Sequence, residues 1–126
     1  MRQPISTPNA PQAIGAYSQA IRAGDWLYIS GQLGLDPASG LLAEGFEAQC
    51  HRMFQNLQAI AEAAGAGLHQ AVKLTVFLVD LADFAQLNTI MAHYVPKPFP
   101  ARAAVQVAAL PKGAAVEADA VLYLGQ

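Results

Sequence analysis

The chain has 126 residues, of which 54% are hydrophobic and only 13% are charged, and its formal net charge is −2. This length suits one domain with one core, which we expect to span residues 1–126. The Lys and Arg residues are scattered from Arg2 to Lys112 instead of forming a basic stripe, which argues against nucleic-acid binding. No apolar run approaches the ~20 residues that a membrane-spanning helix needs.

The apolar fraction is larger than one small core can bury, so we expect a homo-oligomer in which copies of the chain cover part of it. The single cysteine, Cys50, leaves no internal disulfide and fits a reducing compartment. Residues 1–10 lack the basic segment and apolar stretch of a signal peptide. These features predict a soluble cytoplasmic protein.

The first ~20 residues are predicted to be mainly loop, because Pro4, Pro8 and Pro11 interrupt regular structure. Residues 17–20 are then expected to pair with the strand-like segment 25–32, since the A-G-D sequence before the second segment is a turn signal. The sheet therefore begins with a short antiparallel pair.

Two helices with a strand between them are predicted in the middle of the chain. Apolar residues recur at helical spacing over residues 44–64, and Gly65 ends that pattern. Residues 71–79 are rich in β-branched and aromatic side chains and predict a strand. Asp80 can cap the helix that follows, which we expect to stop before Pro96. The second helix shows helical spacing at Phe84, Leu87, Met91 and Tyr94.

The segment 99–121 is predicted to be a β-hairpin, so the element order is β-β-α-β-α-β-β with room for one further short strand. This order predicts an α+β fold: a mixed β-sheet with two helices on one face. The strand residues of the other face are largely apolar or small, and we expect subunits to bury them against one another.

Arg102 and Glu117 are the residues of this hairpin that can carry chemistry. With A-L-P-K (109–112) as the hairpin loop, Ala104 would lie opposite Glu117, and Arg102 would be diagonal to Glu117 at roughly 7–8 Å between Cβ atoms. A guanidinium among apolar residues needs an anionic partner, and a small carboxylate ligand is one candidate, since Arg grips carboxylates with two hydrogen bonds. A structural ion pair between Arg102 and Glu117 is the alternative.

Other polar residues give weaker signals. Tyr17, Ser30 and Asn88 can hydrogen-bond a substrate, although such residues are more often surface or capping groups. The three histidines, His51, His69 and His93, lack metal-ligand spacing. The residue types and their spacing therefore predict a small-anion site on an oligomeric α+β domain.

The same residues lie in motifs that closely resemble the RidA/YjgF family, the reactive intermediate (enamine/imine) deaminases. The resemblance runs over almost the whole chain and includes Asn88. Its motifs are I-G-A-Y-S-Q-A (14–20), Y-I-S-G-Q-L-G-L-D-P (28–37), V-K-L-T-V-F-L-V-D-L-A-D-F (72–84), F-P-A-R (99–102) and L-P-K-G-A-A-V-E (110–117).

The resemblance implies a chorismate-mutase-like homotrimer with ligand clefts between subunits. It implies hydrolysis of 2-imino acids, such as 2-iminobutanoate and 2-iminopropanoate, to 2-oxo acids and ammonia without metal or organic cofactor. The family's carboxylate-binding arginine corresponds to Arg102 and its water-positioning glutamate to Glu117. The other substrate-binding positions that it implies are Tyr17, Ser30, Gly31, Asn88 and Ala104.

Some positions depart from the family pattern. Ala16 replaces a proline, Ala104 stands where many deaminases have cysteine, and Gln106 where many have glutamate. The segment between Asn88 and Arg102 is also a few residues shorter than is typical.

Two other functions stay open: an endoribonuclease or translation inhibitor, and a non-catalytic carboxylate-binding or holdase-like protein.

Overall fold

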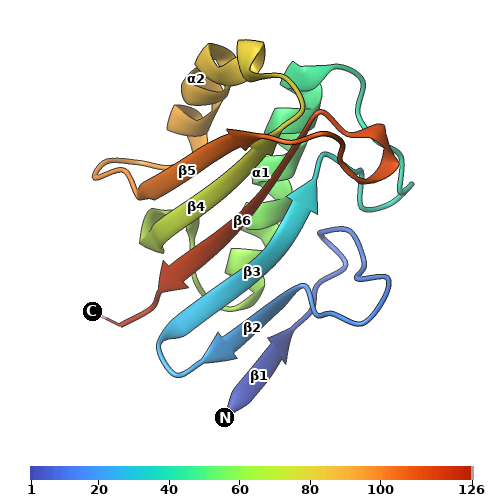
Figure 1. Cartoon of the computed structure of the whole chain (residues 1–126). Helices are drawn as coiled ribbons and strands as arrows, with labels where there is room; N and C mark the ends of the chain where they lie inside the picture. The colour runs from blue at the N-terminus through green and yellow to red at the C-terminus, as the bar shows by residue number, and fades with distance from the viewer. Residues whose placement is uncertain (126) are drawn as a thin grey trace.

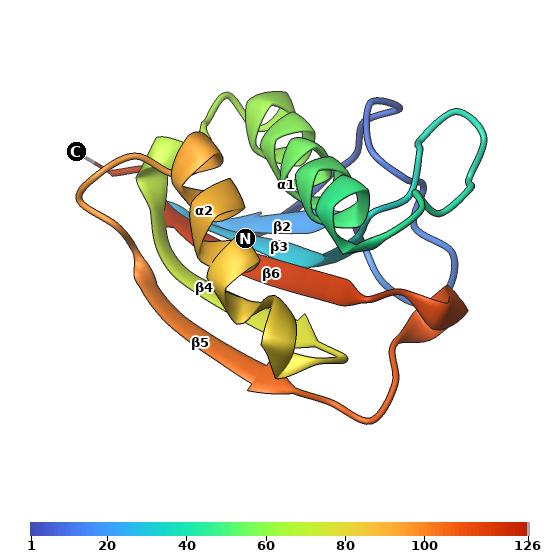
Figure 2. The ribbon, with the colours of Figure 1, turned by 90° about the horizontal axis from the view of Figure 1, so that it is seen from above.

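A single mixed β-sheet with two helices on one face forms the molecule, as the sequence predicted (Figures 1 and 2). The computed structural model describes residues 1–125. The strand order in the sheet is β1-β2-β3-β6-β4-β5. The strands are β1 (Arg2–Ile5), β2 (Ala20–Ala23), β3 (Trp26–Leu33), β4 (Ala71–Leu78), β5 (Ala101–Gln106) and β6 (Val116–Tyr123), and the helices are α1 (Phe46–Ala63) and α2 (Phe84–Tyr94).

Both helices lie where the apolar spacing placed them. Helix α1 ends just before Gly65, whose φ of 75° is a left-handed conformation that glycine adopts without strain. Asp80 accepts a hydrogen bond from the backbone N–H of Ala82 (2.9 Å) and so caps the short 3-10 turn Leu81–Asp83 that leads into α2. Helix α2 ends at Tyr94, before Pro96. No helix among residues 1–125 is long and apolar enough to cross a membrane.

The N-terminal region contains more sheet than predicted. Residues 2–5 form the edge strand β1, which pairs with β2 and tolerates Pro4 because an edge strand need not donate every N–H. The strand that pairs with β3 is Ala20–Ala23, not the predicted residues 17–20, of which residues 17–19 lie in a loop. The predicted turn between them is present and contains Gly24 at φ 61°.

The predicted hairpin of residues 99–121 is wrong. Strand β5 pairs in parallel with β4, whereas β6 lies between β3 and β4 and is antiparallel to both. Burial gives the physical reason, because alternate residues of β6 are completely buried and such a strand belongs at the centre of a sheet. Strand β5 has partly exposed residues throughout and occupies the edge. The 3-10 turn Pro111–Gly113, not a hairpin loop, precedes β6.

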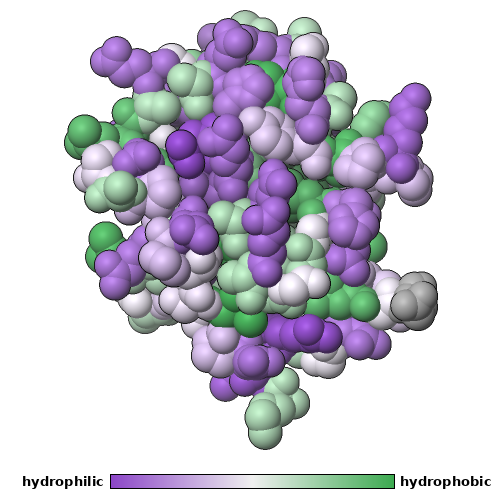
Figure 3. All heavy atoms as spheres, turned by 180° about the vertical axis from the view of Figure 1, so that it is seen from behind, coloured by the Kyte–Doolittle hydropathy of each residue, from purple (hydrophilic) through white to green (hydrophobic). Residues whose placement is uncertain are grey.

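The two faces of the sheet differ in what covers them. The face toward α1 and α2 holds the core, and the outside of that helical layer shows mainly hydrophilic side chains with scattered hydrophobic ones (Figure 3). The opposite face has no covering element within residues 1–125. Its half-buried or exposed apolar side chains are Ile21, Trp26, Tyr28, Phe77, Val105, Val121 and Tyr123.

Cys50 faces the core from α1 with no exposed surface, and burial raises the pKa of its thiol to about 12. Only the thiolate attacks disulfide reagents, so we expect no reaction with an aromatic disulfide reagent at about pH 8 in the folded protein. Denaturant should release one reactive thiol per chain. The reaction is measured by absorbance, and fast labelling of Cys50 in the folded protein would contradict this burial.

Candidate functional site

Arg102 projects from the helix-covered face of β5 toward α2. Its register partner on β4 is Leu74, whose side chain is buried in the core, and residues paired in a parallel ladder share one face of the sheet. The Nη1 atom of Arg102 donates a hydrogen bond to Asn88 Oδ1 at 2.6 Å and contacts Met91 Sδ at 3.7 Å. The guanidinium carbon lies 5.0 Å from the ring centroid of Phe84. Helix α2 therefore holds the cation at this place.

A pocket of about 380 Å³ opens beside this guanidinium. Its walls are apolar apart from Arg102 and Asn88, and no carboxylate among residues 1–125 forms an ion pair with Arg102. The lining residues are Asn88, Met91, Ala92, Phe99, Pro100 and Arg102. An unpaired cation in an apolar hollow is suited to bind a small anion.

Glu117 lies in a second cavity, near the end of β3. A β-bulge interrupts the pairing of β3 with β6 between Ile29 and Gln32 and places Gly31 beside Glu117. A Cβ atom at Gly31 would collide with the Glu117 carboxylate, so glycine leaves the space that this carboxylate occupies. Partial burial raises the pKa of Glu117, and the neighbouring charge of Asp119 raises it further. A carboxylate whose pKa is raised accepts a proton more readily than an ordinary carboxylate.

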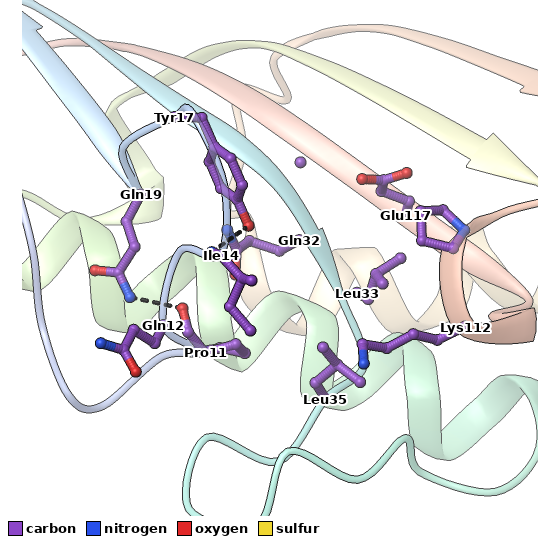
Figure 4. A pocket seen from close by; sticks show the side chains of 12 residues that line it. Pro11, Gln12, Ile14, Tyr17, Gln19, Gln32, Leu33, Leu35, Lys112 and Glu117 are labelled. Carbon is purple, nitrogen blue, oxygen red and sulfur yellow. Dashed lines mark hydrogen bonds between the residues drawn. The ribbon is translucent and has the colours of Figure 1, made fainter.

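The N-terminal loop forms the opposite wall of this second cavity, which has a volume of about 520 Å³ (Figure 4). Tyr17 lines it and accepts a hydrogen bond from the backbone N–H of Ile14 (3.3 Å). The buried amide of Gln19 fastens the loop: its Nε2 donates to the carbonyls of Thr7 (3.1 Å) and Pro11 (2.7 Å). Gln19 thus fixes the segment that carries Tyr17.

The remaining walls come from the end of β3 and the turn before β6. Asn56 on α1 donates hydrogen bonds to the carbonyls of Leu33 (3.0 Å) and Leu35 (2.9 Å), which holds this chain segment against the helix. Lys112 lines the cavity and has a φ of 60°, a left-handed conformation that is uncommon for a residue with a side chain.

Arg102 and Glu117 lie on opposite faces of the sheet within one chain. Glu117 is paired with Phe77, which faces away from the helices, whereas Arg102 is paired with Leu74 in the core. The predicted diagonal arrangement is therefore wrong, and so is the intrachain ion pair between these residues. Ala104 is paired with Val76, not with Glu117, and packs partly against the core beside Arg102.

Two further predicted residues have local partners. The Ser30 hydroxyl donates to the carbonyl of Ser18 at 2.6 Å and so joins β3 to the Tyr17 loop. The Asn88 side-chain oxygen is occupied by Arg102. Among residues 1–125, no group of three or more His, Cys, Asp or Glu side chains is arranged to hold a metal ion. His51 instead hydrogen-bonds Tyr94 through Nδ1 at 2.8 Å.

The sequence and fold of this chain match those of known proteins. The family model described as Endoribonuclease L-PSP, the YjgF/RidA family, matches residues 7–124. This chain belongs to the RidA family. It is 48% identical to the Homo sapiens protein named 2-iminobutanoate/2-iminopropanoate deaminase, over 99% of this chain and 92% of that protein.

Solved structures of RidA-family relatives have the same fold. RidA from the Antarctic bacterium Psychrobacter sp. is 55% identical, with a TM-score of 0.94 over 96% of this chain and 98% of that one. Escherichia coli TdcF with bound serine is 34% identical, with a TM-score of 0.93 over 98% and 99%. The predicted α+β fold and the predicted family are thus confirmed.

Several residues that shape these cavities were not predicted as site residues. Phe84 and Met91 were assigned only to the apolar face of a helix, yet with Asn88 they form one i, i+4, i+7 stripe that contacts Arg102. That stripe is visible in the sequence, but its partner on β5 is not. Gln19 and Lys112 lie inside the family motifs, but nothing local in the sequence places them at a cavity.

Proposed function

We propose that this chain is a hydrolytic deaminase of reactive 2-imino and enamine acids, such as 2-iminobutanoate and 2-iminopropanoate. The observation that carries the proposal is the unpaired guanidinium of Arg102, held by Asn88 in an apolar pocket where a small carboxylate fits. The 48% identity to a protein named for this activity supports the choice of reaction. The bound serine of TdcF, itself a small amino acid with a carboxylate, supports the class of ligand.

The proposed site is shared between two chains of a homotrimer. Within one chain the sheet separates Arg102 from Glu117, so a substrate that needs both residues must bind where one chain supplies the arginine and its neighbour the glutamate. The uncovered apolar face of the sheet gives the chains a surface to bury against one another.

The proposed chemistry is addition of water to an activated C=N bond. Arg102 binds the substrate carboxylate and fixes the position of the imine carbon. Glu117 orients a water molecule, takes its proton as the oxygen attacks that carbon, and passes a proton to the nitrogen. The resulting carbinolamine releases ammonia and leaves the 2-oxo acid. Tyr17, across the same cavity from Glu117, would hydrogen-bond the substrate.

A coupled assay tests the proposed activity. An amino-acid oxidase generates the 2-imino acid in solution, and the release of ammonia and 2-oxo acid is followed with and without the purified chain. The proposal predicts faster release that saturates with substrate and is absent after heat denaturation. Release at the uncatalysed rate, with the protein folded, would overturn it.

A carboxylate-binding protein without turnover is the second candidate, because the Arg102 pocket is complete within one chain, without Glu117. The same assay separates the two functions, since a binding protein would leave ammonia release unchanged. An endoribonuclease, the description attached to the family model, is disfavoured by the net charge of −2 and the scattered basic residues.

The trimer itself has a direct test. Light scattering at micromolar concentration should give a mass of about three times the 13.3 kDa of one chain. A substitution such as Tyr28→Asp, on the uncovered sheet face, should weaken the assembly because it places a charge among apolar side chains. A stable monomer of the unaltered chain would remove the shared site.

A further inference from the structure

One face of helix α2 surrounds the guanidinium of Arg102 with three different kinds of group. Phe84, Asn88 and Met91 follow one another at steps of four and three residues and so lie on the same side of the helix. Phe84 offers the face of an aromatic ring, Asn88 an amide oxygen and Met91 a thioether sulfur.

Within residues 1–125, the polar contacts of Arg102 involve only one of its nitrogens. An arginine side chain has five N–H donors, two on each Nη atom and one on Nε. Nη1 is engaged by Asn88 at 2.6 Å and by Met91 at 3.7 Å. The Nε and Nη2 atoms therefore keep the two parallel donors of the opposite edge of the guanidinium, which suit a carboxylate bound side-on.

The two acceptors at Nη1 hold one corner of the guanidinium, and its plane can still tilt about that corner through small changes in the side-chain torsions. The ring of Phe84, with its centroid 5.0 Å from Cζ, supplies the missing restraint. A cation is attracted to the face of an aromatic ring, so the ring favours one orientation of the guanidinium over the others.

We propose that Phe84 is a positioning residue for carboxylate recognition: its ring holds the Arg102 guanidinium so that the Nε–Nη2 edge faces the ligand. This inference rests on the proposed function for the identity of the carboxylate. It concerns binding, however, and can be tested without turnover. Phe84 is 37% exposed, so its replacement should leave the core largely intact.

The test uses the chain of residues 1–126 as it assembles in solution and 2-oxobutanoate, a carboxylate that the proposed enzyme would release and cannot hydrolyse. Phe84→Leu keeps the apolar bulk and removes the aromatic face, so it should weaken 2-oxobutanoate binding about five-fold by titration calorimetry. Phe84→Trp keeps an aromatic face and should bind within about two-fold of the unaltered chain. Phe46→Leu is the matched control, because Phe46 is likewise the first residue of its helix and partly packs on the core.

A second readout reports on the arginine itself. The NMR order parameter of the Arg102 Nε–Hε group should fall in Phe84→Leu and stay unchanged in Phe46→Leu, while the melting temperatures of both variants stay close to that of the unaltered chain. A merely structural role for Phe84 would lower the melting temperature and leave this order parameter unchanged. An unchanged order parameter together with unchanged 2-oxobutanoate affinity in Phe84→Leu would overturn the inference.

The outcomes also separate this inference from the proposed function. If Arg102→Lys loses 2-oxobutanoate binding and Phe84→Leu does not, the deaminase proposal stands and the role of Phe84 fails. If Phe84→Leu weakens binding but the unaltered chain does not hydrolyse imines, the positioning role stands and the deaminase proposal fails. If 2-oxobutanoate does not bind to the unaltered chain, the order parameter alone decides the role of Phe84.

Discussion

Replacing Arg102 by alanine should lower kcat/KM for 2-imino acid hydrolysis by about a thousandfold, or ~4 kcal/mol of barrier. The substrate carboxylate would then enter a pocket with no cation to meet it. Folding should be little affected, because Arg102 pairs with no carboxylate among residues 1–125 and its removal leaves no buried charge unpaired. The two measurements are the hydrolysis rate and the melting temperature of the same sample.

Arg102→Lys is the sharper variant at this position. Lysine keeps the charge but lacks the planar pair of donors, so we expect a fall of about a hundredfold in kcat/KM, mostly through a higher KM. Hydrolysis at the unaltered rate in Arg102→Lys, or unfolding of the protein in Arg102→Ala, would show that this arginine has a structural role and not a binding one.

Glu117→Gln should lower kcat by about 10²–10⁴-fold while KM changes little. Glutamine has the same shape as glutamate but cannot take a proton from the attacking water. The substitution should also stabilise the protein at neutral pH, because partial burial and the charge of Asp119 both disfavour the Glu117 carboxylate in the folded state. A functional residue held at the expense of stability is common in active sites.

The pH dependence of this stabilisation follows from the direction of the shift. The pKa of Glu117 in the folded chain lies above its ordinary value of 4.5, so the folded state binds the proton more tightly than the unfolded state. Well below pH 4.5 the carboxyl is protonated in both states, and the glutamate and glutamine proteins should be similar in stability. As the pH rises through the raised pKa, the unaltered chain loses stability relative to Glu117→Gln.

Thermal melts of the two proteins between about pH 4 and about pH 8 measure this difference directly. The melting temperature of Glu117→Gln should exceed that of the unaltered chain at the upper end of the range, and the two should converge at the lower end. Asp119→Asn, introduced into both proteins, removes the second cause of the raised Glu117 pKa. It should therefore narrow the difference in melting temperature between them. A difference in melting temperature that widens toward low pH would contradict the raised pKa of Glu117.

The helices were predictable because their signals are local. The apolar spacing of residues 44–64 and the glycine after it locate α1, and Asp80 and Pro96 bracket the turn and helix that include α2. Strand pairing is a non-local property. The segment 99–121 contains β5 and β6, and two strands so close in sequence usually pair with each other. Here the chain between them crosses the end of β4, so β5 lies on one side of β4 and β6 lies on the other, at the centre of the sheet.

The same non-local pairing limited what could be predicted of the site. The family motifs indicate Arg102 and Glu117 as the residues to examine, but the face of the sheet that each occupies depends on register with β4. A hairpin would have placed them on one face, whereas the observed pairing separates them. The Glu117 carboxylate also lies beside Gly31, at a bulge on β3 that is distant in sequence from β6, and no local pattern predicts that contact.

Complementation between two inactive variants tests the shared site most directly. Chains carrying Arg102→Ala and chains carrying Glu117→Gln are co-expressed with different affinity tags, and trimers that contain both are purified through the two tags. If each site takes Arg102 from one chain and Glu117 from the next, every mixed trimer has one intact site, and its activity should be about one third of the unaltered trimer's. Mixed trimers as inactive as the two parents would contradict a site built from both chains.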